Sequence, residues 1–352
     1  MSLDRYVSLP QPHAEQGPPS IGLVTMATYL PEQVQDAAYI AEQSGIPEEI
    51  VHQKLGIKEK RRAGPDDQTS AMALYAARLA LERAEIEPDE LDLILYSGCM
   101  HKDFYVWSAA CRIQYLLKAS RAYAFELTAL STTNVLALKV ARDLMTADSS
   151  LQHVLICGGH RTADLLDLRD HGSRFLFDLA DGGSAMVLKR NHSANLLLGS
   201  SFITDGSLAE DVVIPAGGTR LPTSHETLEQ GLHTFHVTNP EHLRAGLDDI
   251  SEERFVRVIC EAVERSGYAP DEIAFLALNH MKPSAHQRIL SMLGLREEQS
   301  IYLECYGHIG APDQVLALEL AVQEGRLYPG DLVVLASAGL GFTWGATALR
   351  WG

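Results

Sequence analysis

The chain contains the same sequence pattern twice, and this repeat restricts its fold more than any other feature. Residues 80–98, "ALERAEIEPDELDLILYSG", match residues 262–280, "AVERSGYAPDEIAFLALNH", at an offset of 182. Both segments are typical of a helix end, a Pro-Asp-Glu turn and a buried strand. Residues 135–141, "VLALKVA", match residues 315–321, "VLALELA", at an offset of 180. The shared order and nearly constant offset indicate a duplicated α/β unit.

The repeat continues toward the end of each copy. "VLICGG" at residues 154–159 aligns with "VLASAG" at 334–339, and "GSAMVL" at 183–188 resembles "GATALR" at 345–350. Each copy therefore predicts a helix, a strand, a long connection, a strand, a helix, a strand and a closing glycine-rich hairpin. Strands as uniformly apolar as "LDLILYSG" and "DLVVLASAG" are typical of sheets that are covered on both faces.

The repeat also suggests where the chain divides. We expect a flexible N-terminal extension at residues 1–19, which is rich in proline and polar residues, followed by halves at residues 20–190 and 191–352. A pseudo-twofold axis between the halves would bring equivalent strand ends together. A functional site would then take residues from both halves.

Composition argues against several classes of function. The chain carries 29 basic and 46 acidic residues, a net charge of −17, so its overall field does not favour nucleic acid or an anionic membrane. No apolar run reaches the ~18 residues of a membrane span, and the N-terminus lacks the apolar core of a signal peptide. The five cysteines form no CxxC pair, so no zinc site or redox dithiol is indicated. Reduced thiols are typical of a cytoplasmic protein.

Ser131 is the first candidate functional residue. It lies in "YAFELTALSTTNVLALKVARDLM", which predicts a strand, a tight turn and a helix. A strand-to-helix elbow of this kind can present a nucleophilic hydroxyl. A serine near a helix start is more often an N-cap, and the residues at 132–134, Thr-Thr-Asn, have the same capping ability. Both interpretations of Ser131 remain open from spacing alone.

The second copy has different polar residues at the matching positions. The offset of 180 places Ala311 opposite Ser131, and the second elbow instead carries His308 and Asp313. His280 follows the buried strand of the second copy. The structural alternatives are a hydrogen-bonded loop histidine at His280 and an aspartate at Asp313 that is favoured by the start of a helix. Residues that differ where the scaffold repeats are nevertheless candidates for function.

Together these residues offer the parts of a catalytic triad. A serine needs a base to attack an acyl group, and the base needs an acid to orient it. Ser131, His308 and Asp313 supply these three roles. The glycine-rich segment 339–345, "GLGFTWG", predicts a turn whose amides at Leu340 and Gly341 could form an oxyanion hole, although a simple hairpin explains it equally well.

Four motifs resemble a known family. They are the "KLGIKEKRRAGPDDQ" stretch, similar to the family's Gly-Ile-x-x-Arg region, the "WSAACRIQYLL" helix, the "LADGGSAMVL" hairpin and the C-terminal "YGHIGAPDQ…GFTWGATALRW". From about residue 21 to residue 352 the chain resembles β-ketoacyl-acyl-carrier-protein synthase III. The resemblance implies the thiolase fold, an α/β fold with duplicated halves in five layers, α-β-α-β-α. It also implies a homodimer and no permanently bound cofactor.

The resemblance also implies roles for individual residues. The family uses Cys, His and Asn, and these fall on Ser131, His280 and His308, with His286 as the rival of His280. Cys111 matches a non-catalytic helix cysteine of the family. In the family the cysteine takes an acyl group from coenzyme A, and His and Asn hold the malonyl thioester during decarboxylation. A serine requires a true base, which His308 and Asp313 would supply.

We therefore expect an acyltransferase of the ketosynthase III type. Ser131 would take an acyl group from acyl-CoA or an acyl carrier protein and pass it to an acceptor in polyketide or other secondary-metabolite biosynthesis. His280 would polarise a carbonyl group or assist proton transfer. The alternatives are decarboxylative condensation with a malonyl carrier protein and a non-catalytic partner subunit. Ile50 stands where the family has a tryptophan that stacks on adenine, so a carrier protein is a serious alternative donor.

Overall fold

The computed structural model describes residues 18–247 and 250–352. The expected extension at residues 1–19 therefore lies outside the described residues, except for Pro18 and Pro19. The strands are β1 (Ile21–Tyr29), β2 (Gln33–Asp36), β3 (Glu59–Arg62), β4 (Leu93–Tyr96), β5 (Tyr123–Glu126), β6 (His153–Arg161), β7 (Asp181–Arg190), β8 (Leu196–Thr204), β9 (Val212–Val213), β10 (His236–Val237), β11 (Ile273–Leu278), β12 (Leu332–Gly339) and β13 (Thr343–Arg350). The helices are α1 (Ala37–Ser44), α2 (Glu48–Leu55), α3 (Thr69–Ala84), α4 (Ala109–Leu117), α5 (Thr133–Ala147), α6 (His225–Glu229), α7 (Pro240–Leu247), α8 (Ile250–Glu264), α9 (Pro283–Met292) and α10 (Asp313–Gln323).

The predicted duplication is visible in the order of the strands. The main sheet runs β11-β12-β13-β8-β1-β7-β6-β4-β5. Read outward from its centre, the first half is β1-β7-β6-β4 and the second is β8-β13-β12-β11, with equivalent parallel and antiparallel neighbours. Where the strands of the two halves meet, β1 and β8 are paired in register only at Gly22 and Leu196. Two sheets thus meet at one edge, which sequence alone did not predict.

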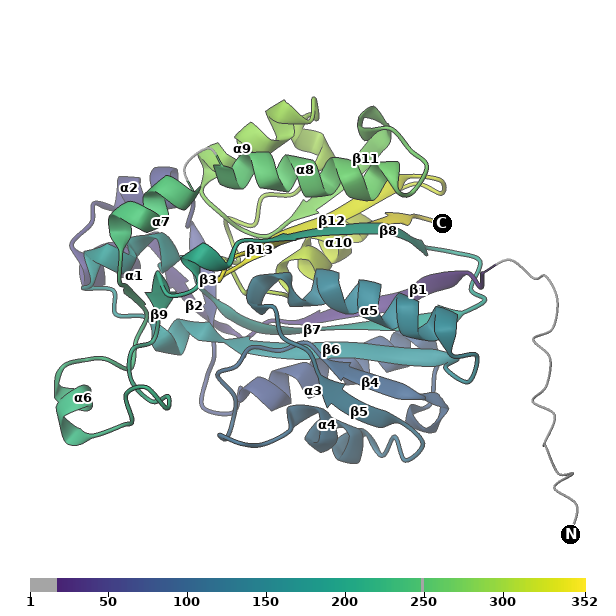
Figure 1. Cartoon of the computed structure of the whole chain (residues 1–352), viewed down its shortest axis with the longest axis horizontal. Coiled ribbons are helices and arrows are strands. Elements are labelled where there is room, and N and C mark those ends of the chain that lie inside the picture. Colours follow the sequence, from purple (N-terminus) through teal and green to yellow (C-terminus); the bar gives the residue numbers. More distant parts are fainter. Residues whose placement is uncertain (1–17, 248–249) are drawn as a thin grey trace, which may run out of the picture.

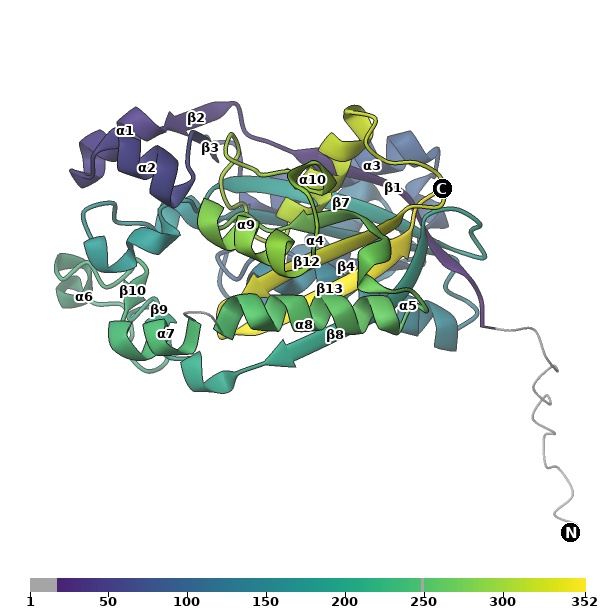
Figure 2. The ribbon, with the colours of Figure 1, turned by 90° about the horizontal axis from the view of Figure 1, so that it is seen from above.

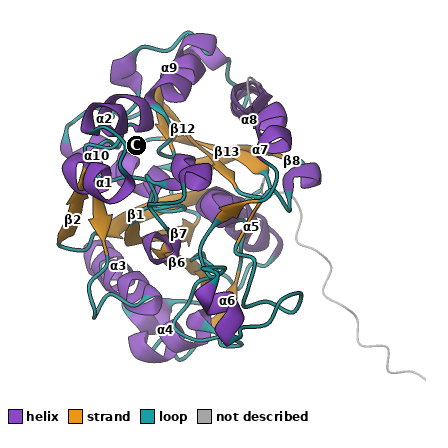
Figure 3. Ribbon diagram, turned by 90° about the vertical axis from the view of Figure 1, so that its left-hand side faces the viewer, coloured by secondary structure: helices purple, strands orange, loops and turns teal. Residues whose placement is uncertain are grey.

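Helices cover both outer faces and fill the space between the halves (Figure 1). Helices α3 and α4 pack on the first half, and α8 packs on the second with α9 beside it. Helices α5 and α10 contact strands of both halves, and Figure 3 shows them between the two groups of strands. Their residues share one hydrophobic cluster with inward-facing residues of both halves. The five-layered thiolase fold is therefore confirmed.

The two central helices explain an unusual sequence feature. In α10 nearly every residue from Asp313 to Ala321 is buried, and "VLALELA" has no clear polar face. A helix that is apolar on all sides is typical of the interior of a protein. Asn134 of α5 donates to the carbonyl oxygen of Ala311 at 2.7 Å, which joins the beginnings of the two helices.

The halves differ in how their last two strands are connected. Between β12 and β13 the chain turns within residues 340–342, whereas β6 and β7 are separated by residues 162–180, which contain two short 3₁₀ helices. The offset accordingly falls from 180 between Val154 and Val334 to 162 between Gly183 and Gly345. The expected tight closing hairpin therefore exists only in the second half, because the first has 18 more residues than the second between these aligned positions.

A smaller group of elements covers one end of the sheets. It consists of α1, α2, α7 and the strand pairs β2–β3 and β9–β10, and Figure 2 shows α1, α2, β2 and β3 beyond the strand ends. Ile40, Val51, Ile57 and Phe177 form the buried core around α1 and α2. The carboxyl ends of β4, β5, β6, β11 and β12 point toward this group. Among the described residues, no helix has the length and apolarity needed to cross a membrane.

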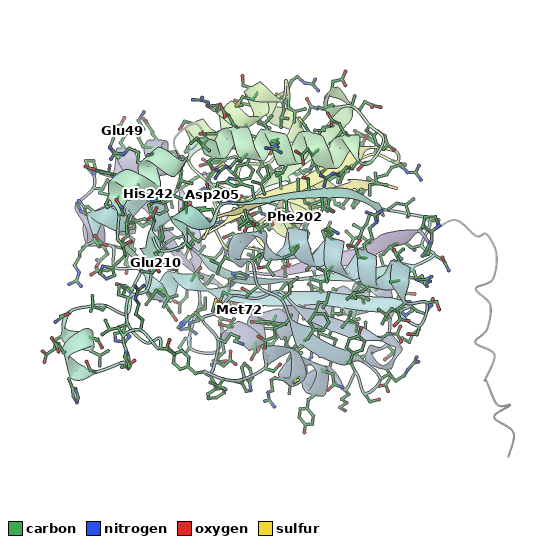
Figure 4. All side chains as sticks on the ribbon, in the orientation of Figure 1. Glu49, Met72, Phe202, Asp205, Glu210 and His242 are labelled. Atoms are coloured by element: carbon green, nitrogen blue, oxygen red, sulfur yellow. The ribbon has the colours of Figure 1, made fainter. Side chains whose placement is uncertain are left out.

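Close packing of α3 on β7 requires glycine at position 183. A Cβ atom there would lie 2.6 Å from the carbonyl oxygen of Met72, a residue labelled on α3 in Figure 4. We predict that Gly183→Ala lowers the free energy of unfolding by about 1–3 kcal/mol, because backbone atoms must move. Gly218→Ala, where a Cβ would meet nothing within 4 Å, is the control and should change stability by less than about 0.5 kcal/mol. Chemical denaturation of both variants tests this, and equal stabilities would contradict it.

Candidate active site

Ser131 lies in a 3₁₀ turn, Leu130–Thr132, between β5 and α5. Leu130 has φ = +51°, a left-handed conformation that is uncommon outside glycine and often occurs at functional sites. The turn is fixed from the second half of the chain. Ser337 donates its hydroxyl to the carbonyl oxygen of Ser131 at 2.9 Å, and Thr132 donates its hydroxyl to that of Thr343 at 2.8 Å. The N-cap position of α5 is occupied by Thr132, so Ser131 is not the capping residue.

The hydroxyl of Ser131 contacts a histidine from the other half. Ser131 Oγ lies 2.8 Å from His308 Nε2, and His308 Nδ1 lies 2.6 Å from Asp313 Oδ2. A proton on Nδ1 would be donated to the carboxylate, which leaves the lone pair of Nε2 facing the serine hydroxyl. This is the geometry by which a base removes a proton from a serine. Ser131, His308 and Asp313, which were predicted to act together, are therefore connected by consecutive hydrogen bonds.

Asp313 is completely buried and its carboxylate is fully used. Oδ1 accepts the backbone N–H of Ile309 at 2.8 Å, and Oδ2 accepts the backbone N–H of His280 at 2.8 Å as well as the contact from His308. A buried carboxylate needs such donors to offset its lost hydration. Because Asp313 is the first residue of α10, the helix dipole also favours its negative charge.

The backbone around His308 is held as in a short parallel strand pair. His308 forms an isolated bridge with Leu179, donating its N–H to the carbonyl oxygen of Asp178 at 2.7 Å and accepting from Ala180 N at 2.8 Å. Gly307 precedes it with φ = +73°, and a Cβ there would lie 2.6 Å from the same Asp178 oxygen. The additional residues of the first half thus support the histidine of the second.

The surroundings of His308 alter its proton affinity in opposite directions. Burial alone lowers the pKa of an imidazole, but the charge and hydrogen bond of Asp313, together with the charge of Asp178, outweigh it and leave the pKa of His308 above its ordinary value. His308 therefore binds a proton more readily than a free histidine. This suits a group that accepts the proton of Ser131.

The ring of His280 is engaged elsewhere. Its Nδ1 lies 2.9 Å from Asp178 Oδ2, and its Nε2 lies 3.1 Å from the carbonyl oxygen of Gly56. The side chain is completely buried and packs against the ring of Tyr302. The structure brings only the backbone N–H of His280 to the triad, through Asp313. The ring of His286 also packs against Tyr302, in an edge-on contact. Burial, aided by the charge of His280, lowers the pKa of His286 to about 4.

The predicted oxyanion turn lies beside the serine. A Cβ on Gly339 would stand 2.2 Å from the carbonyl oxygen of Ala129 and 3.2 Å from the amide nitrogen of Ser131, so β12 ends in close contact with the elbow. Leu340 and Gly341 follow directly in the turn to β13. Their amides as oxyanion donors remain a prediction. Across residues 18–247 and 250–352, no cluster of three or more His, Cys, Asp or Glu side chains could hold a metal ion.

Two family models match the chain. The model for 3-oxoacyl-[acyl-carrier-protein] synthase III matches residues 125–206, and the model for its C-terminal part matches residues 263–351. A β-ketoacyl-[acyl-carrier-protein] synthase III from Symbiobacterium thermophilum is 31% identical over 94% of this chain and 98% of the relative. The chain belongs to the β-ketoacyl-acyl-carrier-protein synthase III family. It is therefore related to transferases that act as condensing enzymes.

Solved structures agree with this assignment. The synthase III of Aquifex aeolicus superposes with a TM-score of 0.81 and 25% identity, covering 94% of this chain and all of that one. ChlB3, described as an acyltransferase, superposes with a TM-score of 0.79 and 22% identity over 95% of this chain and 98% of its own, which shows a shared fold.

Sequence reasoning missed three buried polar residues around the candidate site. Asp178 receives both the backbone of His308 and the ring of His280. Lys60 is buried beside Asp178, within the Gly-Ile-x-x-Arg region. His160 is the second-to-last residue of β6 and lies against Gly310. Burial lowers its pKa to about 3 despite the Ser97 backbone, and the charge of His308 lowers it further. Asp178 lies in no motif, and Lys60 lies in the Gly-Ile-x-x-Arg region without a role assigned to it from sequence. Only "GGH" near the end of a strand indicated His160.

We predict that Asp313→Asn changes both the rate and the pH dependence of the serine's reaction. In the wild type the reaction rate should rise as the pH increases through the raised pKa of His308, because only the neutral ring accepts a proton. Without the carboxylate this midpoint should move to lower pH, and the plateau rate should fall roughly 10⁴-fold because the ring loses its orientation. Single-turnover acylation with a thioester probe across pH 5–9 measures both. An unchanged midpoint would show that Asp313 does not set the proton affinity of His308.

Proposed function

We propose that the protein is an acyltransferase in which Ser131 takes an acyl group from a thioester and passes it to an acceptor. The observation that carries this proposal is the line from Ser131 Oγ to His308 Nε2 at 2.8 Å and from His308 Nδ1 to Asp313 at 2.6 Å. A cysteine can react as a thiolate, but a serine needs a base of this kind. The family membership and the acyltransferase ChlB3, which shares the fold, are consistent with thioester substrates.

The triad accounts for both half-reactions. His308 Nε2 removes the proton of Ser131 while Oγ bonds to the thioester carbon, and the C–S bond then breaks as the imidazolium returns the proton to the departing thiol. An oxygen ester on Ser131 remains. The acceptor's hydroxyl, amine or thiol then gives its proton to Nε2 and attacks this ester, which restores the serine. The amides of Ser131 and of the Leu340–Gly341 turn would stabilise the oxyanion in both steps.

The geometry favours this function over decarboxylative condensation. Condensation in the family relies on a histidine and an asparagine that hold the malonyl carbonyl, and these positions carry His280 and His308. His280 directs its two ring nitrogens to Asp178 and Gly56, and His308 directs Nε2 to Ser131. A neutral His280 ring can donate to only one of its two acceptors, but both of its nitrogens face protein atoms, so neither ring directs a nitrogen toward a second carbonyl in this arrangement. A non-catalytic partner subunit is also disfavoured, since a subunit without chemistry gains nothing from an aligned triad.

The donor is proposed to be an acyl group on a phosphopantetheine arm, carried either by coenzyme A or by an acyl carrier protein. Both serve as substrates, so no permanently bound cofactor is required. Ile50, which stands where the family stacks a tryptophan on adenine, lies exposed on α2. This position offers no aromatic platform, which favours the carrier-protein donor. We further propose a homodimer working in the cytoplasm on a polyketide or other secondary-metabolite pathway.

We predict that Ser131→Ala removes the acyl-enzyme. Wild-type protein incubated with acyl-CoA and acyl-carrier-protein thioesters should gain the mass of one acyl group, and the variant should gain none because its nucleophile is absent. Ser149→Ala, at an exposed position beyond the far end of α5, is the matched control and should be acylated normally. Intact-protein mass spectrometry followed by peptide mapping gives the result. Acylation of the variant by its preferred donor would overturn the proposal.

We also predict that the protein does not decarboxylate malonyl thioesters. Release of carbon dioxide from labelled malonyl carrier protein should equal the Ser131→Ala background within error, because the His280 ring is not available to the malonyl carbonyl. Release above that background, together with a β-ketoacyl product, would favour the condensing function instead.

A further inference from the structure

Lys60 on β3 is a lysine inside the protein, with only 1% of its surface exposed. Its Nζ donates to the carbonyl oxygens of Phe177 at 2.7 Å and Leu179 at 2.8 Å. Removing an ammonium group from water is costly, so a chain that keeps one in its interior needs these bonds. The triad chemistry described above makes no direct use of it.

The two carbonyl groups stand on either side of Asp178. The carbonyl oxygen of Asp178 accepts the N–H of His308 at 2.7 Å, and Leu179 forms the bridge to His308. The ammonium group of Lys60 therefore holds the backbone immediately before and after the peptide unit on which the catalytic histidine rests.

The start of β3 and the residue before it also hold the segment that leads into His308 from the other side. The N–H groups of Lys58 and Glu59 both donate to the carbonyl oxygen of Glu304, at 2.9 and 3.1 Å. Farther along, a Cβ on Gly307 would lie 2.7 Å from the Cβ of Lys60, so the two backbones are in direct contact. Lys60 thus contacts both segments that hold His308 in place, residues 177–179 and Gly307.

We propose that Lys60 is a positioning residue of the acyl-transfer site, whose ammonium group holds residues 177–179 so that His308 Nε2 stays within reach of Ser131 Oγ. The inference rests on the proposed role of His308 as the base, and it adds a residue that touches neither substrate nor triad. A misplacement of about 1 Å at a catalytic group can reduce a rate roughly 100-fold, so a support of this kind has a measurable effect.

The charge of Lys60 provides a test that simple packing does not. Burial lowers the pKa of Lys60 to about 8, while Asp178 and Asp181 raise it and Arg62 lowers it further. Hydrogen bonds from a charged donor are roughly twice as strong as neutral ones, so the hold on residues 177–179 weakens above that pH. An unfolded lysine titrates near a pKa of about 10.4. Between these values the unfolded chain binds more protons, so this group makes folding more favourable as the pH rises. Because the hold on residues 177–179 weakens when Lys60 loses its proton, the acylation rate should decline through pH 8 even though the protein stays folded.

The experiment compares three variants in single-turnover acylation of Ser131 by a short acyl-carrier-protein thioester. Lys60→Met keeps the length of the side chain without its charge, and Lys60→Arg keeps the charge, with arginine standing at this position in the family's Gly-Ile-x-x-Arg motif. Lys58→Met is the control, because Lys58 lies only two residues before Lys60 and its side chain is exposed. Rates are measured from pH 6 to pH 9.5, with circular dichroism recording the folded fraction at each pH.

We expect Lys60→Met to acylate between about 10-fold and 100-fold more slowly at pH 7 and to lose the alkaline decline near pH 8. Lys60→Arg should recover at least half of the rate and show no decline near pH 8, and Lys58→Met should match the wild type. If Lys60→Met is unfolded, Lys60→Arg decides, because retention of the wild-type decline would overturn the proposal. Equal rates in folded Lys60→Met would also overturn it. Absence of acylation in the wild type would instead refute the proposed function itself.

Discussion

The buried carboxylate of Asp313 is the interaction on which the rest of the site depends. It receives the imidazole of His308, the backbone of Ile309 and the backbone of His280, and it begins the central helix α10. A carboxylate without water is stable only when donors surround it, so each of these groups is held in place by the same charge. The loop before α10, the end of β11 and the base that faces Ser131 are therefore ordered together.

The duplication explains how two halves form one site. The repeated scaffold places the beginnings of α5 and α10 side by side between the sheets, joined by the bond from Asn134 to Ala311. Ser131 then comes from one elbow and His308 from the other. The symmetry is broken where it matters chemically: the 18 additional residues of the first half supply Asp178, which supports His308 and binds the ring of His280.

Asp178 connects the two histidines of the candidate site. Its carboxylate lies against Nδ1 of His280, and its backbone carbonyl oxygen accepts the N–H of His308. The family resemblance implies that the catalytic histidine and asparagine positions fall on His280 and His308, and the structure places Asp313 against the ring of His308. The proposed acyl transfer through Ser131 rests on these contacts.

The sequence by itself determined the duplicated α/β architecture, the elbow at Ser131 and the residues at the matching elbow. These features depend on local periodicity and on the offset between copies, both of which are readable along the chain. It did not predict the joining of the two sheets at Gly22 and Leu196, the contacts of the His280 ring or the buried position of Lys60. Only the tertiary structure decided these, because each depends on a contact between segments more than 100 residues apart. No local pattern records which carbonyl oxygen or carboxylate a buried side chain will meet.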